Sequence, residues 1–438
     1  MSPFLKLRGV TMDTVYEKLR RDADIIVKES IKHVLPDTIV TKTLDNIFSE
    51  TGDDITNKNI YLAAIGKAAW QMAYTACEVL KEKGIDLKHG IIVTKYGHIK
   101  GKIENVECFE GAHPVPDENS FNASLKIIDM ARALTKDDIL IFLISGGGSA
   151  LFEYPMISGS ELQDITSALL KSGADINEIN TVRKHLSLVK GGKFAEIVYP
   201  AKVYSCILSD VLGDKTDTIA SGPTCPDTTT STDALNIIKK YGIKISEEGT
   251  RAIMTETPKK LTNATNYVSG SVKEFSVAAK EACERMGYKA EILDDSVTCI
   301  ASDAGRKLAH KAKELFERYE ETDTALIIGG ETVVHVTGNG KGGRNSELAL
   351  SGAEIIKDLP IALFSVGSDG TDGPTDAAGG YTDGETYKKA AELNLSISDY
   401  LKDNDSYNFL KQVDGLIFTG PTGTNVNDVS VALIKAKQ

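Results

Sequence analysis

Residues 325–345 read ALIIGGETVVHVTGNGKGGRN, an apolar strand that runs into a glycine-rich loop and then into a helix. Two other segments have the same form: the apolar run 139–144 is followed by SGGGS, and the run 361–366 by GSDGTDGPTD. Glycine lets the backbone approach a ligand closely, and amides at a strand–helix turn bind anions. Three such loops, distributed over both halves of the chain, predict one site for a polyanionic ligand.

The composition is that of an ordinary globular enzyme of two or three domains, with 438 residues, 41% apolar and 26% charged. A formal net charge of −12 argues against nonspecific nucleic-acid binding, which needs lysine and arginine to neutralise phosphates. The apolar runs are too short to span a membrane, and no signal peptide is visible. The six cysteines form no Cys-x-x-Cys pair, which favours reduced thiols. We expect a cytoplasmic enzyme without a nucleic-acid or membrane partner, either a monomer or a homodimer.

Helical and strand patterns alternate along the chain, which predicts βαβ crossovers and parallel sheets covered by helices on both faces. Strands are expected at 60–65, 90–94, 138–144, 202–208, 266–269, 289–293, 325–328, 360–366 and 416–418. Helices are expected at 11–34, 68–83, 119–134, 159–171, 272–286 and 302–319. The predicted fold is α/β, with an N-terminal domain over 1–265 and a C-terminal domain over 323–438. Part of 266–322 could pack with the N-terminal domain. Ligands of such sheets bind beyond the carboxyl ends of the strands.

A dinucleotide site is a competing interpretation, because residues 338–343 fit the pattern G-x-G-x-x-G between a strand and a helix. Asp369, after the next strand, occupies the place of a ribose-binding acid. The motif lies far from the start of the chain, however, and Asp369 is more distant than the usual roughly 20 residues. It also stands in a cluster with Asp372 and Asp376. A Walker A motif is absent around Lys67, because Tyr61 and Ala68 replace the required residues.

Several single residues indicate chemistry at these loops. Lys67 and Arg344 each stand at the start of a helix, where a cation opposes the helix dipole, so both are expected to serve the site as buried cations. Asp210 follows the strand 202–208, at a sheet edge that suits a catalytic carboxylate. The carboxylates of Asp369, Asp372 and Asp376 suit Mg²⁺, although an Asp/Gly turn explains them equally well. His113 and His185 are candidate general bases, but a lone histidine is more often structural.

Taken in order, these segments resemble the class II glycerate kinases, the glycerate 2-kinase family with a C-terminal MOFRL domain. The similar stretches are collinear and span nearly the whole chain: 66–69, 113–117, 145–151, 180–187 with 190–192, 209–214, 221–224, 329–332, 342–345, 369–378 and 422–428. The resemblance implies two αβα-layered domains with largely parallel sheets and an active-site cleft between them. It also implies ATP-dependent phosphorylation of D-glycerate, with Lys67 and Arg344 as active-site groups. Related sequences carry the name hydroxypyruvate reductase, so an NAD(P)H-dependent oxidoreductase stays an alternative, as does a non-catalytic nucleotide-binding protein.

We therefore expect phosphoryl transfer from Mg·ATP to D-glycerate, giving 2-phosphoglycerate and ADP, with the two domains closing around the reacting group. Lys67 and Arg344 would stabilise the transferring charge, and Asp210 would orient or deprotonate the glycerate hydroxyl. Mg²⁺ would be held by Asp372 and Asp376. The residues expected to bind ATP or another anion are Ser145, Gly146, Gly147, Gly148, Ser149, Lys190, Gly330, Glu331 and Asn345.

Overall fold

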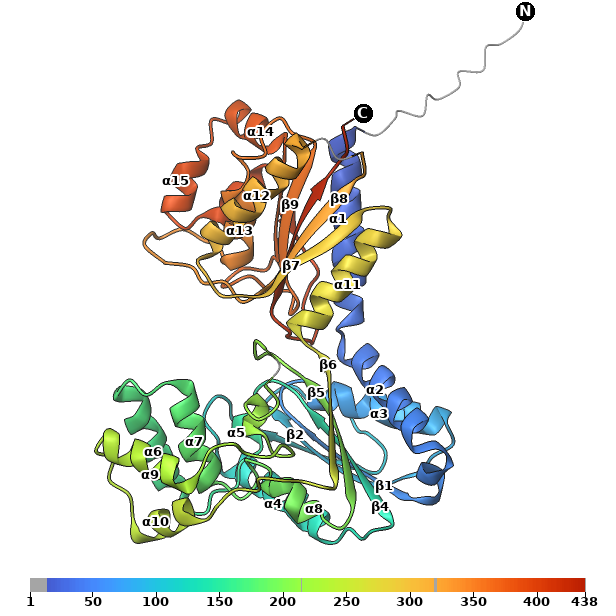
Figure 1. Ribbon diagram of the computed structural model, residues 1–438, viewed down its shortest axis with the longest axis vertical. Helices are drawn as coiled ribbons and strands as arrows, with labels where there is room; N and C mark the ends of the chain where they lie inside the picture. Colours follow the sequence, from blue (N-terminus) through green and yellow to red (C-terminus); the bar gives the residue numbers. More distant parts are fainter. Residues whose placement is uncertain (1–13, 214, 319–320, 438) are drawn as a thin grey trace, which may run out of the picture. The chain divides into compact units, whose positions relative to one another are not determined.

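The computed structural model describes residues 14–213, 215–318 and 321–437, and its chain divides into two compact units (Figure 1). The parallel-sheet unit comprises residues 33–274 and 423–426. The mixed-sheet unit comprises the described residues of 14–32, 275–422 and 427–437. Among the described residues, no helix combines the length and the apolar character needed to cross a membrane. Residues 11–13 and 319 of two expected helices, and Asp214, lie outside the described residues.

These units differ from the expected boundaries, because the N-terminal helix α1 (Val15–His33) packs largely with C-terminal residues. Asp22 accepts hydrogen bonds from the Tyr288 hydroxyl at 2.6 Å and from Lys435 Nζ at 3.4 Å. Arg20 donates to the backbone carbonyl of Asp414 at 2.9 Å. Segment 275–322 joins the same unit because its strand pairs with the strand that follows it. The linear division at 265 and 323 therefore does not match these compact units.

The parallel-sheet unit contains six parallel strands in the order β3-β2-β1-β4-β5-β6. Its strands are β1 (Asn59–Ile65), β2 (Leu87–Lys95), β3 (Val106–Gly111), β4 (Asp138–Ile144), β5 (Lys202–Leu208) and β6 (Ala264–Gly270). Its helices are α2 (Pro36–Thr51), α3 (Ala69–Glu82), α4 (Glu118–Arg132), α5 (Gly148–Leu151), α6 (Gly159–Lys171), α7 (Ile176–Leu186), α8 (Lys193–Val198), α9 (Ser231–Lys240) and α10 (Glu247–Met254), with 3-10 turns η1 (Gly52–Asn57) and η2 (Ile219–Ser221). Because all six strands run the same way, their carboxyl ends share one edge of the sheet.

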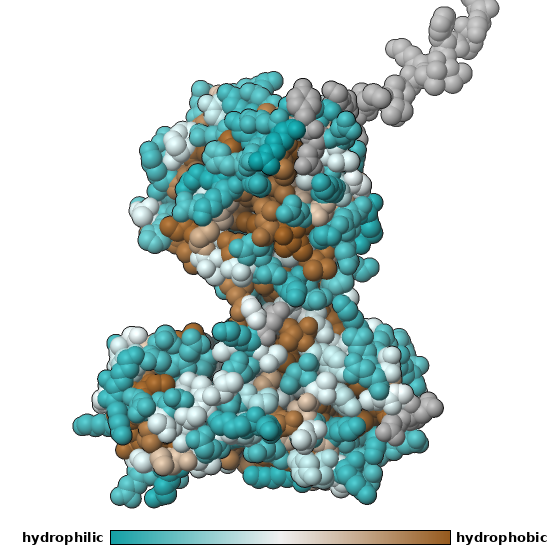
Figure 2. Space-filling model, viewed as in Figure 1, coloured by the Kyte–Doolittle hydropathy of each residue, from teal (hydrophilic) through white to brown (hydrophobic). Residues whose placement is uncertain are grey.

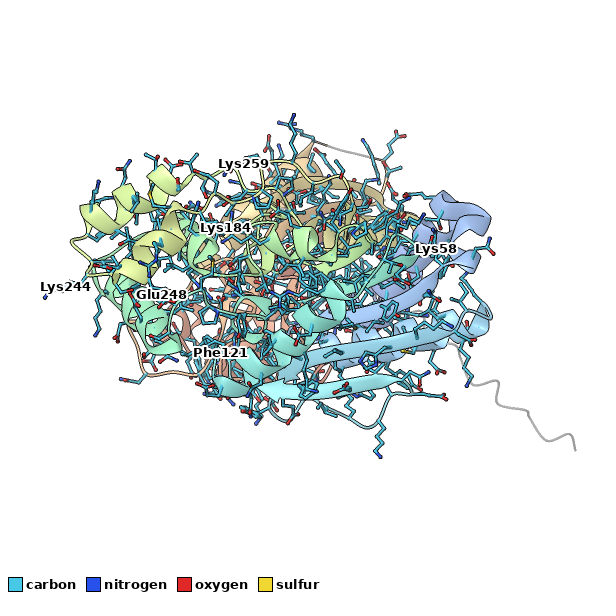
Figure 3. All side chains as sticks on the ribbon, turned by 90° about the horizontal axis from the view of Figure 1, so that it is seen from below. Lys58, Phe121, Lys184, Lys244, Glu248 and Lys259 are labelled. Carbon is cyan, nitrogen blue, oxygen red and sulfur yellow. The ribbon has the colours of Figure 1, made fainter. Side chains whose placement is uncertain are left out.

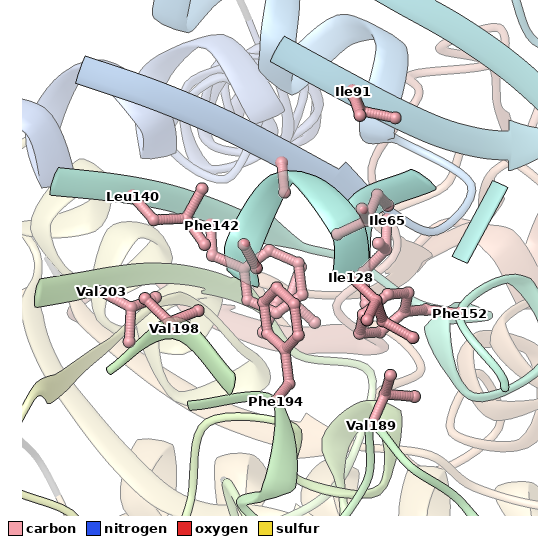
Figure 4. Close-up of a cluster of buried hydrophobic side chains, with 14 of the residues drawn as sticks. Ile65, Ile91, Ile128, Leu140, Phe142, Phe152, Val189, Phe194, Val198 and Val203 are labelled. Atoms are coloured by element: carbon pink, nitrogen blue, oxygen red, sulfur yellow. The ribbon is translucent and has the colours of Figure 1, made fainter. Parts of the chain in front are cut away.

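An aromatic cluster anchors the centre of this sheet (Figure 4). Phe142 of β4 lies 5.7 Å from Phe152 and 4.9 Å from Phe194, measured between ring centroids. Phe152 and Phe194 pack edge to face at 5.0 Å. Such contacts are worth more than the area they bury. The cluster fixes α5 and α8 against β4, so it also fixes the loop between β4 and α5.

The mixed-sheet unit has six strands in the order β11-β10-β9-β12-β8-β7. They are β7 (Lys289–Val297), β8 (Thr324–Gly330), β9 (Ile361–Gly367), β10 (Gly379–Asp383), β11 (Leu416–Ile417) and β12 (Asp428–Ile434). Besides α1, the helices are α11 (Val272–Arg285), α12 (Ala301–Glu317), α13 (Arg344–Ser351), α14 (Thr386–Glu392), α15 (Ile397–Lys402) and α16 (Ser406–Gln412), of which α11 continues across the division at residue 274.

The α/β class is confirmed, but the second sheet is not largely parallel. Only the β7–β8 pairing in it is parallel, whereas β9, β10, β11 and β12 pair antiparallel with their neighbours. The reason lies in the connections: β9 and β10 are joined directly by the loop 368–378, without a crossover helix, so the chain turns back on itself. Strand β12 then enters between β8 and β9 in the opposite direction.

Hydrophilic and intermediate residues cover most of the visible face of the parallel-sheet unit, whereas a broader area of hydrophobic residues shows across the middle of the mixed-sheet unit (Figure 2). The six cysteines lie within the described residues and are free thiols.

Candidate active site

Three connecting segments meet at the carboxyl edge of the parallel sheet. Ile65, the last residue of β1, is in register with Ile144 of β4, and Ile144 is in register with Ile207 of β5. The turn carrying Lys67, the loop Ser145–Ser149 and Asp210 therefore leave the sheet side by side. Lys67 N donates to Gly146 O at 2.9 Å, which joins the first two segments directly.

The Ser145 side chain fixes the loop to the β1–α3 turn. Its hydroxyl donates to Ile65 O at 3.1 Å and accepts from Ala68 N at 3.1 Å. Among the hydrogen bonds of the described residues, none uses the backbone amides of Gly146, Gly147 or Ser149. These three residues are partly exposed. The loop therefore has unused amide donors, which are the feature that an anion-binding nest requires.

The side chains of Asp210, His113 and Lys67 lie close to the loop glycines Gly146 and Gly147. A Cβ atom at Gly146 would lie 2.5 Å from Asp210 Oδ2. A Cβ atom at Gly147 would lie 3.0 Å from His113 Cδ2, 3.2 Å from His113 Nε2 and 3.4 Å from Lys67 Cγ. Glycine at both positions thus leaves room for Asp210, His113 and Lys67 around the loop. His113 was only a weak candidate from the sequence, and the structure adds it to this group.

Lysine side chains determine the electrostatics at the carboxyl edge of the parallel sheet. Burial, followed by the positive charges of Lys67 and Lys95, lowers the pKa of His113, so its imidazole is neutral at neutral pH. Lys67 itself is exposed, not buried as expected. It lies in the turn before α3, with its Cγ atom near Gly147. An exposed lysine remains available to an incoming anion.

Lys190, also expected among the nucleotide-binding residues, lies beneath the loop and is 1% exposed. Its Nζ donates to the carbonyls of Ser149 and Phe152, each at 2.9 Å, and lies 3.3 Å from Glu153 Oε2. Arg183 donates to the same Ser149 carbonyl at 3.0 Å. Lys190 therefore contacts the backbone of the loop from the protein side.

The neighbouring Lys184 is similarly enclosed. Its Nζ lies 3.1 Å from Asp227 Oδ1 and 3.2 Å from Asp217 Oδ2. In Figure 3 it lies among the inner side chains of the unit, whereas Lys244 reaches the outer edge. The basic stretch expected from 180–187 is thus partly an interior network of paired charges.

In the mixed-sheet unit, Arg344 is the first residue of α13 and is held by two carboxylates. Its Nε and Nη2 donate to Asp428 at 2.5 and 3.1 Å, and its Nη1 donates to Glu331 Oε1 at 2.8 Å. Asp428 begins β12, in register with Gly330 and Gly367. Gly330, Glu331, Arg344 and Asp428 therefore gather at one edge of the mixed sheet.

Burial raises the pKa of Asp428 to about 6, although the adjacent Arg344 lowers it. Desolvation opposes the charge on Arg344, but Asp428 and Glu331 together raise the pKa of the guanidinium. The helix-dipole penalty inferred for a cation at this position is therefore offset by two acids. Asp428 was not assigned a role from the sequence.

Asp372 caps the same helix. Its Oδ1 accepts from Asn345 N at 2.9 Å and its Oδ2 accepts from Ser346 N at 2.8 Å. Asp376 is exposed, and its Oδ1 accepts from the Tyr407 hydroxyl at 2.7 Å. The described residues contain no group of three or more histidine, cysteine or acidic side chains placed to hold a metal ion. A magnesium site at Asp372 and Asp376 stays a prediction.

The G-x-G-x-x-G segment is packed against protein. A Cβ atom at Gly338 would lie 2.3 Å from Asp403 O, and one at Gly343 would lie 2.3 Å from Asp372 Oδ1. The amides of Gly338 and Gly340 donate to Asn404 Oδ1 and Asp403 O, at 2.9 and 2.8 Å. These glycines serve close contacts within the unit, and the neighbouring sheet is mostly antiparallel. Both features are unlike a dinucleotide-binding βαβ unit.

Comparison with known proteins agrees with this architecture. A family described as "Domain of unknown function (DUF4147)" matches residues 22–254, and the MOFRL family matches residues 324–428. The D-glycerate 2-kinase of Thermotoga maritima is 50% identical over 423 residues, which cover 95% of this chain and 99% of that protein. The chain belongs to the glycerate 2-kinase family.

Two further comparisons bear on the family assignment. A crystal structure of glycerate kinase from Thermotoga maritima superimposes with a TM-score of 0.88 at 50% identity, covering 95% of this chain and all of that one. A protein of Agrobacterium vitis named putative hydroxypyruvate reductase is 38% identical and covers 84% of this chain and 86% of its own length. Glycerate 2-kinase relatives and the reductase name therefore occur within one group of similar sequences.

Proposed function

We propose that this member of the glycerate 2-kinase family transfers the γ-phosphoryl group of ATP to the 2-hydroxyl of D-glycerate, giving 2-phosphoglycerate and ADP. The observation that carries the proposal is the loop Ser145–Ser149, where the amides of Gly146, Gly147 and Ser149 make no hydrogen bond among the described residues, and where Lys67, Asp210 and His113 lie close by. Phosphoryl transfer needs this combination, because it depends on positioning and on stabilising negative charge.

Each side chain has a proposed part. The loop amides bind an anionic group, either an ATP phosphate or the glycerate carboxylate. Lys67 and Arg344 stabilise charge on the transferring group, Arg344 through paired N–H donors that lysine lacks. Asp210 orients the glycerate hydroxyl, since a loose transition state asks little of a base. Glu331 and Asn345 would lie beside the nucleotide through their contacts with Arg344 and Asp372.

Magnesium enters this proposal as part of the substrate Mg·ATP. Both oxygens of Asp372 already accept backbone amides, so a resident ion there would compete with the α13 cap. Asp376 is exposed and has one oxygen on Tyr407. Replacing Asp376 with Asn should raise the Mg²⁺ concentration that gives half-maximal activity if Asp376 contacts the ion. Asp399→Asn, which removes an exposed acid of α15 that lies 3.9 Å from Lys402 Nζ, serves as the control.

A coupled assay for ADP with D-glycerate and ATP tests the activity, and phosphorus NMR of the product identifies the hydroxyl. Absence of ADP together with NADH oxidation on hydroxypyruvate would establish the reductase instead. ATP binding without turnover in the same assay would indicate a non-catalytic nucleotide-binding protein.

A further inference from the structure

We propose that Lys190, with Glu153 as its buried counter-ion, is a positioning residue that holds the Ser149 carbonyl and thereby aims the Ser145–Ser149 loop. Its kinetic consequence rests on the proposed function, because that function places an anion on the loop amides. The structural consequence does not depend on any substrate.

The end of helix α5 explains why the Ser149 carbonyl needs an outside donor. In a continuing helix this carbonyl would accept from the amide of Glu153, four residues ahead. Glu153 N donates instead to Ser124 Oγ at 3.0 Å, and the helix stops at Leu151. Lys190 Nζ takes the place of the missing amide and also binds Phe152 O, each at 2.9 Å. One ammonium group thus ends the helix that begins at the loop.

Neighbouring contacts hold Lys190 and its targets in place. Arg183 Nη2 reaches the same Ser149 carbonyl at 3.0 Å, and Ser149 Oγ lies 3.3 Å from Ser221 Oγ. Phe152 and Val189 belong to the aromatic-centred core, so both chain segments leave packed positions (Figure 4). A shift of Ser149 would move the amides of Gly147 and Ser149 with it.

The charge on Lys190 is costly to maintain in this position. Burial lowers its pKa to about 8, although Glu153 raises it. Glu153 is fully buried, and neither of its oxygens accepts a hydrogen bond of good geometry from the described residues. A buried ion pair often gives no more stability than apolar side chains of the same size. Positioning of the loop accounts for the presence of the buried Lys190–Glu153 pair, whereas the contribution of the pair to the stability of the fold does not.

The decisive variant replaces both charges, Lys190→Met with Glu153→Met, so that no unpaired charge is left in the core. We expect its thermal midpoint to fall moderately, because the carbonyls of Ser149 and Phe152 lose the donor that Lys190 supplies, and kcat/KM to fall about 10- to 100-fold because the loop is no longer held in position. The double variant should raise the KM for one substrate. The KM for the same substrate should rise when a residue of the loop itself, such as Gly147, is replaced. Hydrogen–deuterium exchange of residues 145–153 should become faster, with exchange elsewhere in the chain unchanged.

Lys193→Met is the matched control. Lys193 is another buried lysine, but its Nζ donates to the carbonyls of Lys184, His185 and Ser187 at the end of α7. This variant should lose stability and keep the wild-type KM values for ATP and glycerate. If Lys193→Met made hydrogen–deuterium exchange at 145–153 as fast as it is in the double variant, the assignment to Lys190 would be overturned.

Two outcomes of the double variant would also overturn the proposal. The first is wild-type kinetics with unchanged exchange in 145–153. The second is a fall in kcat/KM without faster exchange there, because Lys190 would then act on the ligand directly. If the wild type forms no ADP from glycerate, the proposed function fails separately, and the exchange measurement still decides the role of Lys190.

Discussion

Arg344 combines an unfavourable helix position with three hydrogen bonds to acids. As the first residue of α13 it opposes the helix dipole, but Asp428 binds its guanidinium through two donors and Glu331 binds a third. Asp372 adds a negative charge at the same helix start. The arrangement fixes the planar guanidinium and leaves further N–H groups for a ligand. Lysine could keep the charge at this position but not the geometry.

We therefore expect Arg344→Lys to lower kcat by about 10²–10⁴, which corresponds to roughly 3–5 kcal/mol of transition-state stabilisation. The fold should survive, because lysine can still pair with Asp428. Steady-state ADP assays and thermal melts measure the two effects. Arg318→Lys, an exposed arginine paired with Glu314, is the control and should leave both unchanged. Near-normal turnover in Arg344→Lys would exclude the proposed role.

The raised pKa of Asp428 predicts that kcat falls on the acid side of its pH profile. Its pKa, raised to about 6 by burial, lies above the ordinary value of roughly 3.9 in an unfolded chain. Protonation below about pH 6 weakens the pair with Arg344, so kcat should fall there. The folded state binds this proton more tightly than the unfolded chain does. The contribution of Asp428 to the free energy of unfolding should therefore increase as the pH falls from about 6 to about 4.

Activity and stability thus respond to Asp428 in opposite directions. In Asp428→Asn we expect a lower kcat and the loss of the limb near pH 6, measured in kcat profiles from pH 5 to pH 8. The charged neighbours Glu331 and Asp372 remain in the variant. A limb that persists unchanged would assign the titration to another group.

At the scale of elements, the β4–α5 loop predicts a specific effect of Gly147→Ala. Gly147 has φ of +86°, and a side chain would meet His113 and Lys67. Gly173, after α6, has φ of +75° with nothing within 4 Å of a Cβ atom. Alanine at either site carries a similar backbone cost, about 1 kcal/mol.

Only Gly147→Ala should raise the KM for ATP or for glycerate, because only this loop presents amides to an anion. Thermal melts of Gly147→Ala and Gly173→Ala measure the loss of stability that both variants share, so this loss can be separated from an effect on KM. Equal KM values in the two variants would mean that the loop is a tight turn without a ligand.

Sequence patterns predicted five of the six strands of the parallel sheet and missed β3, Val106–Gly111. The strands 138–144 and 202–208 were predicted to the residue, because each is rich in apolar residues and stands next to a turn signal. Strand β10, Gly379–Asp383, escaped detection because two glycines and two polar residues leave it without an apolar pattern. Strand β12 was not among the expected strands, although its residues 429–434 are largely apolar.

The site could be predicted only in part, for a physical reason. Lys67 and the glycines 146–148 follow predicted strand ends, and Arg344 stands at a helix start after a glycine-rich loop, so their neighbourhood follows from the chain. The partners of buried charges do not. Nothing in the order of residues places Asp428 against Arg344, 84 positions earlier, or Lys190 under Ser149, 41 positions earlier. Tertiary packing decides those pairs.

At the scale of the molecule, the proposed site residues fall in both units. Lys67, the 145–149 loop and Asp210 belong to the parallel-sheet unit, and Arg344 with Asp428 belongs to the mixed-sheet unit. If both sets serve one phosphoryl group, the units must close around it and exclude water. Small-angle scattering should then show a smaller radius of gyration with glycerate and an ATP analogue together than with neither. An unchanged profile would contradict a shared site.

Strand β12 has a consequence for the order in which the chain acquires its structure during synthesis. It pairs along its whole length with β8 on one side and β9 on the other, so the mixed sheet lacks its middle until residues 428–434 have left the ribosome. Helix α1 is synthesised before Tyr288 and Lys435, so Asp22 cannot form its hydrogen bonds with them until those residues have been made. The parallel-sheet unit is almost uninterrupted in sequence and has no such delay. After residue 274 has left the ribosome, and until residues 428–435 follow, nascent chains should therefore carry one nearly complete unit and one exposed amphipathic helix to which chaperones can bind.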